Sequence, residues 1–197
     1  TIPDKIQPIK QIVTDKVKEA EKFYQESLAR GNEGIMAKSL ESIYKPGSRV
    51  GYGVKIKPVL ETLDLVIVKA EHGEGKRAGW LTSYSVACLD RKKEKLLEIG
   101  KVSTGLKEKE QETGVTYLEI TKLLNPLIEI QKGKEVTVKP KIVLEIAYQE
   151  IQKSGEYSSG YGLRFPRVLK LRVDLGVHDC DDITKVEKIY QTQKSGG

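Results

Sequence analysis

Hydrophobic and polar residues follow two different periods in the first sixty residues, which predicts a mixture of helix and strand. Between residues 17 and 29 apolar positions recur at helical spacing, so we expect a helix there, capped by Asp15 and ended by Arg30-Gly31-Asn32. Residues 6–14, 33–40 and 52–57 have strand-like patterns, and Pro58 stops the last of them.

Stronger strand patterns begin at residue 63. Strands are predicted over residues 63–71, 80–90, 96–105, 135–140, 142–151 and 167–173. A helix is expected around residues 115–124, before Asn125-Pro126, and a last helix after Asp181 or Asp182 carries Ile183, Val186, Ile189 and Tyr190 on one face.

This order of elements predicts a mixed α+β fold with two parts. Three strands, a helix and further strands are typical of a five-stranded OB-type β-barrel, here residues 63–197 with a C-terminal helix. Residues 1–62 contain too few elements to bury a core unaided, so we interpret them as part of a larger domain.

Composition narrows the class of protein. The 197 residues are 38% hydrophobic and 31% charged, which is typical of a globular chain and leaves no membrane span. The two cysteines cannot form a disulfide framework, and Asp4 and Lys5 stand where a signal peptide needs apolar residues. We therefore expect a cytoplasmic protein without a membrane partner.

The net charge of +6 is shared between both parts, since residues 1–62 hold 11 basic and 8 acidic residues and residues 63–197 hold 23 and 20. Two basic stretches stand out. Lys55 and Lys57 lie in a segment without acids, and a second segment contains Arg164, Arg167, Lys170 and Arg172. Such patches suit phosphate groups, although many basic clusters are only solvated.

In the first part, Glu33 precedes a glycine in the strand-like segment EGIMAK (33–38), and its carboxylate suits Mg²⁺. An edge strand with charged ends is the alternative. Lys55 and Lys57 should lie on one face of a strand, where a phosphate between them would relieve their repulsion. Lysines that protect an exposed sheet edge explain the same pattern.

The segment RFPRVLKLRVD (164–174) is more informative. In an extended strand Lys170, Arg172 and Asp174 share one face, and Leu169, Leu171 and Val173 share the other. Pro166 indicates that the strand starts just after it. Arginines bind phosphate oxygens bidentately, so this segment suits a polyphosphate or a nucleic-acid backbone, and Asp174 is positioned to orient Arg172.

Other sites are excluded by their spacing. The loop HGEGKR (72–77) lacks the hydroxyl residue and upstream glycine of a Walker motif, and Gly51-Tyr52-Gly53 lacks the third glycine of a dinucleotide fingerprint. The two histidines and two cysteines do not have zinc spacing, and no Ser-His-Asp arrangement stands out.

Taken in order, three segments resemble the C-terminal half of archaeal ATP-dependent DNA ligases. EGIMAK is similar to the fourth nucleotidyltransferase motif of that family, YKPGSR (44–49) followed by VKIKP (54–58) to the fifth, and RFPRVLKLRVD to the sixth. Gly53-Val54 replace an aromatic residue usual before the first lysine of the fifth motif.

The resemblance implies a partial adenylation (nucleotidyltransferase) domain over residues 1–62 and an OB domain over residues 63–197. It also implies ATP and Mg²⁺ as cofactors and nicked duplex DNA as partner, in the cytoplasm at the nucleoid. Glu33 would help to bind the metal, Arg49 and Lys55 would contact the nucleotide, and Lys57 would lie beside its phosphate. The cations at positions 164, 167, 170 and 172 would orient the pyrophosphate, and the linker of residues 58–64 would act as a hinge.

The nucleophilic lysine of that family lies in a Lys-x-Asp-Gly motif, and this chain contains no Asp-Gly dipeptide. We therefore expect a C-terminal portion of a longer ligase, which needs the N-terminal part as partner and cannot form a covalent adenylate alone. Two alternatives are a stand-alone OB module that binds single strands and an RNA-capping or RNA-ligating relative. The first normally stacks bases on aromatic residues, and no aromatic cluster accompanies the basic motifs.

Overall fold

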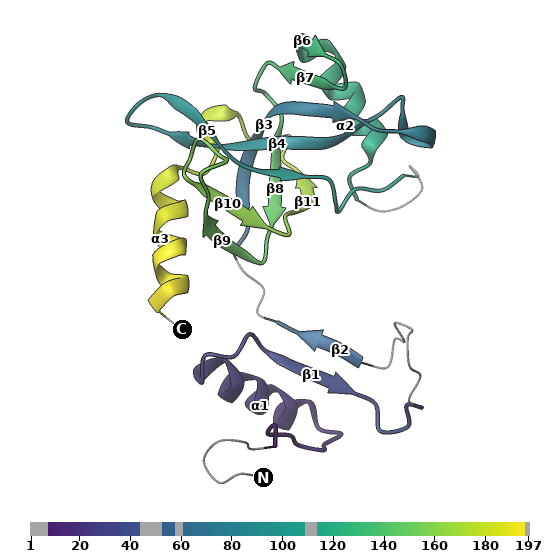
Figure 1. The fold of residues 1–197 in the computed structure, drawn as a ribbon, viewed down its shortest axis with the longest axis vertical. Helices are drawn as coiled ribbons and strands as arrows, with labels where there is room; N and C mark the ends of the chain where they lie inside the picture. The colour runs from purple at the N-terminus through teal and green to yellow at the C-terminus, as the bar shows by residue number, and fades with distance from the viewer. Residues whose placement is uncertain (1–7, 44–52, 58–60, 109–113, 196–197) are drawn as a thin grey trace. The chain divides into compact units, whose positions relative to one another are not determined.

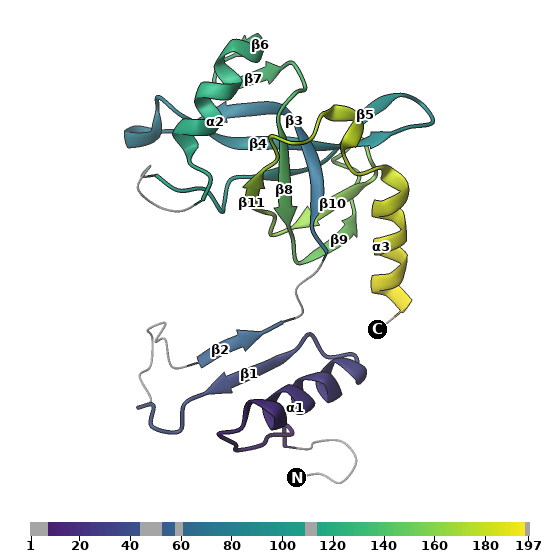
Figure 2. The same cartoon turned by 180° about the vertical axis from the view of Figure 1, so that it is seen from behind.

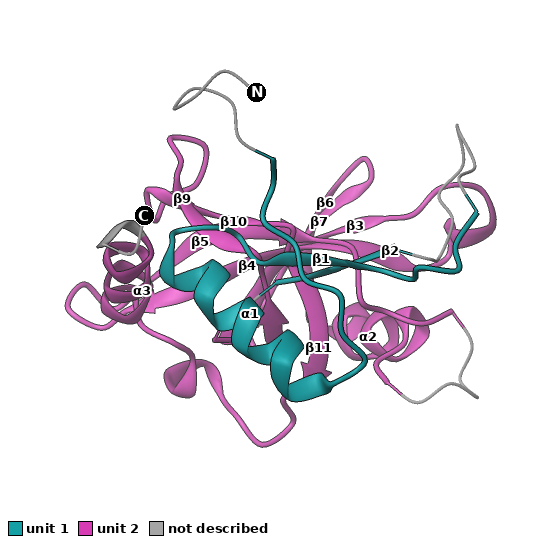
Figure 3. Ribbon diagram, turned by 90° about the horizontal axis from the view of Figure 1, so that it is seen from below, with its two compact units in different colours: residues 1–59, 196–197 teal, residues 60–195 magenta. Residues whose placement is uncertain are grey.

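A computed structural model describes residues 8–43, 53–57, 61–108 and 114–195 of the chain (Figure 1). The chain divides into two compact units (Figure 3). Unit 1 comprises residues 1–59 with residues 196–197, and unit 2 comprises residues 60–195. Arg49 and the rest of the YKPGSR segment (44–49) lie outside the described residues.

Unit 1 contains one helix and a two-stranded antiparallel sheet. Its elements are α1 (Val17–Ala29), β1 (Ile35–Lys38) and β2 (Gly53–Ile56). The predicted helix is confirmed, and Gly31, with φ +77°, follows its C-cap residue Arg30. None of the residues of α1 is buried, which agrees with the expectation that this segment does not form a core of its own.

Two local predictions for unit 1 are wrong. Asp15 does not cap α1: the N-cap residue is Lys16, whose backbone N–H donates to Oγ1 of Thr14. The strand expected over residues 6–14 is not formed by the described residues 8–14, which have no strand to pair with. A strand pattern alone cannot supply the neighbouring ladder that a strand requires.

Unit 2 is built on a seven-stranded antiparallel sheet in which β11, β8, β3, β4 and β5 follow one another, while β7 pairs with β3 and β6. A separate hairpin joins β9 and β10. The strands of unit 2 are β3 (Leu63–His72), β4 (Leu81–Asp90), β5 (Lys95–Val102), β6 (Ile128–Lys132), β7 (Glu135–Val138), β8 (Val143–Ala147), β9 (Glu150–Lys153), β10 (Tyr161–Arg164) and β11 (Arg167–Leu171).

The long strand β3 organises this sheet. Its first half pairs with β8 and its second half with β7, and β4 runs along its other edge. Leu63, Leu65 and Ile67 of β3 are fully buried in the main core, as the strong hydrophobic pattern from residue 63 predicts. Each such side chain contributes about 2 kcal/mol of burial free energy.

Two helices cover the sheet, α2 (Tyr117–Leu124) beside β4 and α3 (Ile183–Ser195) beside β9 and β4 (Figure 2). Short 3₁₀ turns connect some of these elements: η1 (Gly75–Arg77) lies between β3 and β4, η2 (Asn125–Leu127) follows α2, and η3 (Val177–Asp179) precedes α3. Of the two predicted capping residues, Asp182 accepts a hydrogen bond from the Thr184 backbone, which begins α3.

The mixed α+β class is confirmed, but the strand count and some boundaries differ. The sequence predicts six strands from residue 63 onward and a five-stranded barrel, whereas the described part of unit 2 has nine strands, seven of them in one sheet. Strands β11 and β5, at the two ends of the order in this sheet, are not paired with each other in the described part of the chain. Strand β6 is missed because most of its side chains are exposed and give no alternation. The single strand predicted over residues 142–151 is two strands, β8 and β9, which belong to different sheets.

Candidate functional site

In unit 1 a glycine brings the candidate metal ligand Glu33 next to the candidate phosphate ligand Lys57. Gly34 has φ +140°, and a Cβ at this position would lie 2.1 Å from the carbonyl oxygen of Ile56. Only glycine permits this close approach of two backbones. As a result, Nζ of Lys57 lies 2.7 Å from Oε2 of Glu33.

Lys55 lies on β2, opposite Met36 of β1, and its side chain is exposed. No residue in the described part of unit 1 forms an ion pair with it. The two lysines therefore differ: Lys57 already has a carboxylate partner, and Lys55 presents its charge to solvent. The sequence pattern alone predicted an anion between them.

The basic segment of unit 2 turns sharply between β10 and β11. Phe165 has φ +49°, which is uncommon for a residue with a side chain, and Pro166 follows it. Thr104, after β5, holds the end of this turn and the start of β11: its Oγ1 donates to the Pro166 carbonyl at 2.8 Å, and its carbonyl accepts from the Val168 N–H at 2.9 Å. The turn is thereby fixed to the sheet.

Of the four predicted cations in this segment, Arg164 and Arg172 are held by carboxylates. Nη1 of Arg164 donates to Oε1 of Glu150 at 2.8 Å, and its guanidinium lies 5.2 Å from the centre of the Phe165 ring. Arg167 and Lys170, on β11, have exposed side chains. These two exposed cations can approach an anion directly.

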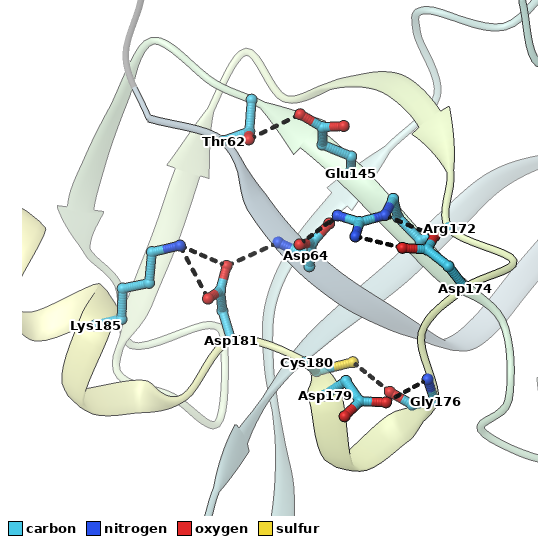
Figure 4. Close-up of polar contacts among 10 residues, drawn as sticks. All are labelled: Thr62, Asp64, Glu145, Arg172, Asp174, Gly176, Asp179, Cys180, Asp181 and Lys185. Atoms are coloured by element: carbon cyan, nitrogen blue, oxygen red, sulfur yellow. Dashed lines mark hydrogen bonds and ion pairs between the residues drawn. The ribbon is translucent and has the colours of Figure 1, made fainter.

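Arg172 lies between two carboxylates just after β11 (Figure 4). Its Nε and Nη2 donate to Asp174 at 3.0 and 2.7 Å, and its Nη1 donates to both oxygens of Asp64 at 2.8 and 2.7 Å. The predicted ion pair with Asp174 is confirmed. Hydrogen bonding to Arg172 lowers the pKa of Asp174 to about 2, and the same bond, with a further contribution from Asp64, raises the pKa of Arg172.

The predicted alternation of faces in this segment is wrong at two positions. Leu169 and Val173 were expected on the apolar face, but they are 47% and 86% exposed. The register of β11 against β8 shifts between Val168 and Lys170, so Leu169 is the extra residue of a β-bulge. Val173 lies beyond the end of the strand.

Sequence reasoning missed Phe165 and Asp64. Phe165 is 70% exposed, a large apolar side chain beside the guanidinium of Arg164. Its positive φ is a property of the folded turn that the sequence does not reveal. Asp64 lies 108 positions before Arg172. Its signal in the sequence was one acidic residue within the apolar first part of that strand, residues 63–68.

The other candidate metal ligands and the two cysteines do not form a second site in the described part of the chain. Among the described residues no group of three or more His, Cys, Asp or Glu side chains could hold a metal ion, so Glu33 could supply a single carboxylate. Cys88 and Cys180 are buried and free, and burial raises the pKa of each thiol to about 12. No helix within the described ranges has the length and apolar character that crossing a membrane requires.

Two family models match the chain. The model described as ATP dependent DNA ligase domain matches residues 1–57, and the model described as ATP dependent DNA ligase C terminal region matches residues 77–175.

Two similar curated proteins are archaeal DNA ligases. A DNA ligase of Nanoarchaeum equitans is 54% identical over 180 residues, which are 91% of this chain and 32% of the relative. A DNA ligase of Archaeoglobus fulgidus is 50% identical over 190 residues, 96% of this chain and 33% of the relative. The chain thus spans about a third of the length of these relatives.

Solved structures agree at the level of the fold. The ligase domain of M. tuberculosis LigD matches with a TM-score of 0.50 and 26% identity, over 81% of this chain and 50% of that one. A structure titled Pmar-Lig_PreS3 matches with a TM-score of 0.55 over 80% of this chain and 32% of that one; at 21% identity it indicates the fold alone.

Proposed function

Because the chain belongs to the ATP-dependent DNA ligase family, we propose that it is the C-terminal part of a longer enzyme that seals nicks in duplex DNA. The reaction would pass through a lysyl-AMP and a DNA-adenylate. The observation that carries this proposal is the match of two ligase family models, one after the other, to residues 1–57 and 77–175. The nucleophilic lysine would lie outside this chain, which has no Asp-Gly dipeptide.

Residues 1–62 would then be the end of the adenylation domain, and residues 63–197 the OB domain with its C-terminal helix. The division of the chain into compact units near residue 60 supports this assignment. The absence of buried residues in α1 supports it too, because a helix of a larger domain needs the rest of that domain to cover it.

Transfer of a nucleotidyl group is catalysed mainly by positioning and by neutralising phosphate charge. Lys55, whose ammonium is exposed, would contact the nucleotide together with Arg49, and Lys57 would lie at its phosphate. In the OB domain the pyrophosphate would be oriented by Arg164, Arg167, Lys170 and Arg172.

The family's usual Mg²⁺ fits this arrangement in part. Mg²⁺ is commonly held by one or two carboxylates together with substrate phosphates and water. Glu33 supplies one exposed carboxylate, beside a lysine that would bind the same phosphates. The ion, when bound, would withdraw charge from the phosphate; Glu33 would hold and orient it.

Nicked duplex DNA and the N-terminal part of the same ligase would be the partners, and the protein would act in the cytoplasm at the nucleoid. Phosphate contacts by exposed cations release counterions, so DNA binding should weaken steeply with salt. The exposed side chains of Arg167 and Lys170 are suited to such contacts.

The test is the transfer of AMP from radiolabelled ATP to the longer ligase and to this chain alone, each with Mg²⁺. We expect a stable protein–AMP product only with the longer enzyme, and we expect Lys55→Ala to reduce it by at least about tenfold. Lys22→Ala, at an exposed lysine of α1, is the matched control. A covalent adenylate on this chain alone would contradict the proposal, as would an unchanged yield in Lys55→Ala.

A further inference from the structure

Asp64 and Arg172 meet across 108 positions of sequence (Figure 4). Asp64 is the second residue of β3, and Arg172 follows the end of β11. Both are largely shielded, with side chains 24% and 21% exposed. Burial to this degree strengthens a charge-assisted hydrogen bond relative to one at a fully exposed site.

The backbone of Asp64 is fixed by Asp181, just before α3. The Asp64 N–H donates to Oδ2 of Asp181 at 2.8 Å, and the Asp181 N–H donates to the Asp64 carbonyl at 2.9 Å. Lys185 of α3 in turn donates to both Asp181 oxygens at 2.9 Å. The carboxylate of Asp64 therefore extends from a backbone that is bonded on both sides.

The two carboxylates around Arg172 have different origins. Asp174 lies two residues along the chain, so it moves with Arg172 and cannot orient it relative to the sheet. Asp64 belongs to the central strand β3, so its bond to Nη1 fixes the guanidinium against the body of unit 2. A guanidinium has five N–H donors, and the bonds to the two carboxylates use at most four of them, which leaves at least one N–H on Nη2.

We propose that Asp64 is a positioning residue for Arg172: it holds the guanidinium in one orientation, so that the remaining N–H is directed at the triphosphate during lysine adenylation. The inference rests on the proposed ligase function. It assigns no contact between Asp64 and the nucleotide; Asp64 acts through Arg172 alone.

The experiment compares Asp64→Asn with Glu145→Gln in the longer ligase. Glu145 lies directly opposite Asp64 on β8 and binds Thr62, not Arg172, so Glu145→Gln removes the same charge from the same region. Adenylation is followed at saturating ATP, and sealing of a nick that already carries AMP is followed separately. We expect Asp64→Asn to slow adenylation by on the order of tenfold. Its rate of sealing an adenylated nick should stay within about twofold of the wild-type rate. Glu145→Gln should leave the rates of both steps unchanged.

A double mutant separates positioning from a structural role. If Asp64 acts through Arg172, Asp64→Asn has no further effect on adenylation when Arg172 is already Ala. A further loss in that background would overturn the inference, as would equal losses of adenylation and sealing. The ligase proposal fails by a different result: the wild-type enzyme would then form no protein–AMP at all.

Discussion

In unit 1 the ammonium of Lys57 lies 2.7 Å from Oε2 of Glu33, so a residue expected at a phosphate and a residue expected at a metal form one ion pair. Gly34 makes this possible, because a side chain there would collide with the Ile56 carbonyl. Each partner sets the charge around the other. A change at either position should therefore affect the binding of an anion and of a cation together.

Lys57→Ala in the longer ligase is the first prediction. The substitution removes one cation from the phosphates and leaves the nearby Glu33 charge without it, and both changes disfavour a triphosphate. We expect the rate of lysyl-AMP formation to fall by at least about tenfold. Lys16→Ala is the control, since it breaks a comparable Lys–Glu pair of 3.1 Å in the same unit; equal rates in the two variants would argue against a role for Lys57.

Arg167 leads to a second prediction, because its exposed guanidinium is on a strand whose start is fixed by Thr104. Arg167→Ala should slow adenylation by about tenfold and slow sealing of a pre-adenylated nick much less, since only the first step handles pyrophosphate. Single-turnover measurements of the two steps distinguish them. Lys132→Ala, at an exposed residue of β6, is the control, and equal losses in both steps would remove the pyrophosphate role.

The sequence predicted those elements whose own side chains determine them. The helical spacing of residues 17–29 and the apolar run from residue 63 correspond to α1 and β3. The bulge at Leu169 was not predictable in this way, because it arises from the register between β11 and β8. Asp15 failed as a cap for a similar reason, since Thr14 already accepts the Lys16 N–H.

In the candidate site, too, a contact within one segment was predictable from the sequence, and contacts between distant segments were not. The two-residue spacing of Arg172 and Asp174 was enough to predict their ion pair, although Asp174 lies in the turn after β11 and not in the strand. The bond from Arg172 to Asp64 depends on the packing of β11 beside β8 and of β8 beside β3. The pairing of Glu33 with Lys57 likewise joins two segments that the sequence presents separately.

The carboxyl group of Asp174 should make the stability of the fold depend on pH. Its pKa is lowered from 3.8 to about 2 by hydrogen bonding to Arg172. A carboxylate with a lowered pKa in the fold stabilises it above the unfolded value, so this contribution is complete above about pH 4 and is lost as the pH falls toward 2.

Titration of Asp174 followed by NMR should give a midpoint near 2 in the wild-type chain and a clearly higher one in Arg172→Ala. In urea unfolding, the stability difference between wild type and Asp174→Asn should shrink between about pH 4 and pH 2. A wild-type midpoint at the ordinary value would mean that the ion pair does not persist in solution.

Gly105 lies against the backbone of β11 at Val168. The last prediction concerns the substitution of this glycine by alanine. Gly105 has φ +94°, and a Cβ there would lie 2.1 Å from the Val168 carbonyl oxygen and 2.8 Å from the Val168 nitrogen. Gly105→Ala would therefore combine backbone strain with a collision against β11. We expect the free energy of unfolding to fall by about 2 kcal/mol or more.

Urea unfolding of Gly105→Ala and Gly155→Ala measures this effect against a matched change. Gly155 has no atom within 4 Å of the position of an added Cβ, so its substitution should change stability by less than about 0.5 kcal/mol. Because Val168 N–H is bonded to Thr104, next to Gly105, a displaced β11 would also move Arg167. Gly105→Ala should then slow adenylation in the longer ligase even at temperatures where the variant remains folded. A fully active variant with wild-type stability would contradict this prediction, because it would show that β11 can shift to accept the added methyl group.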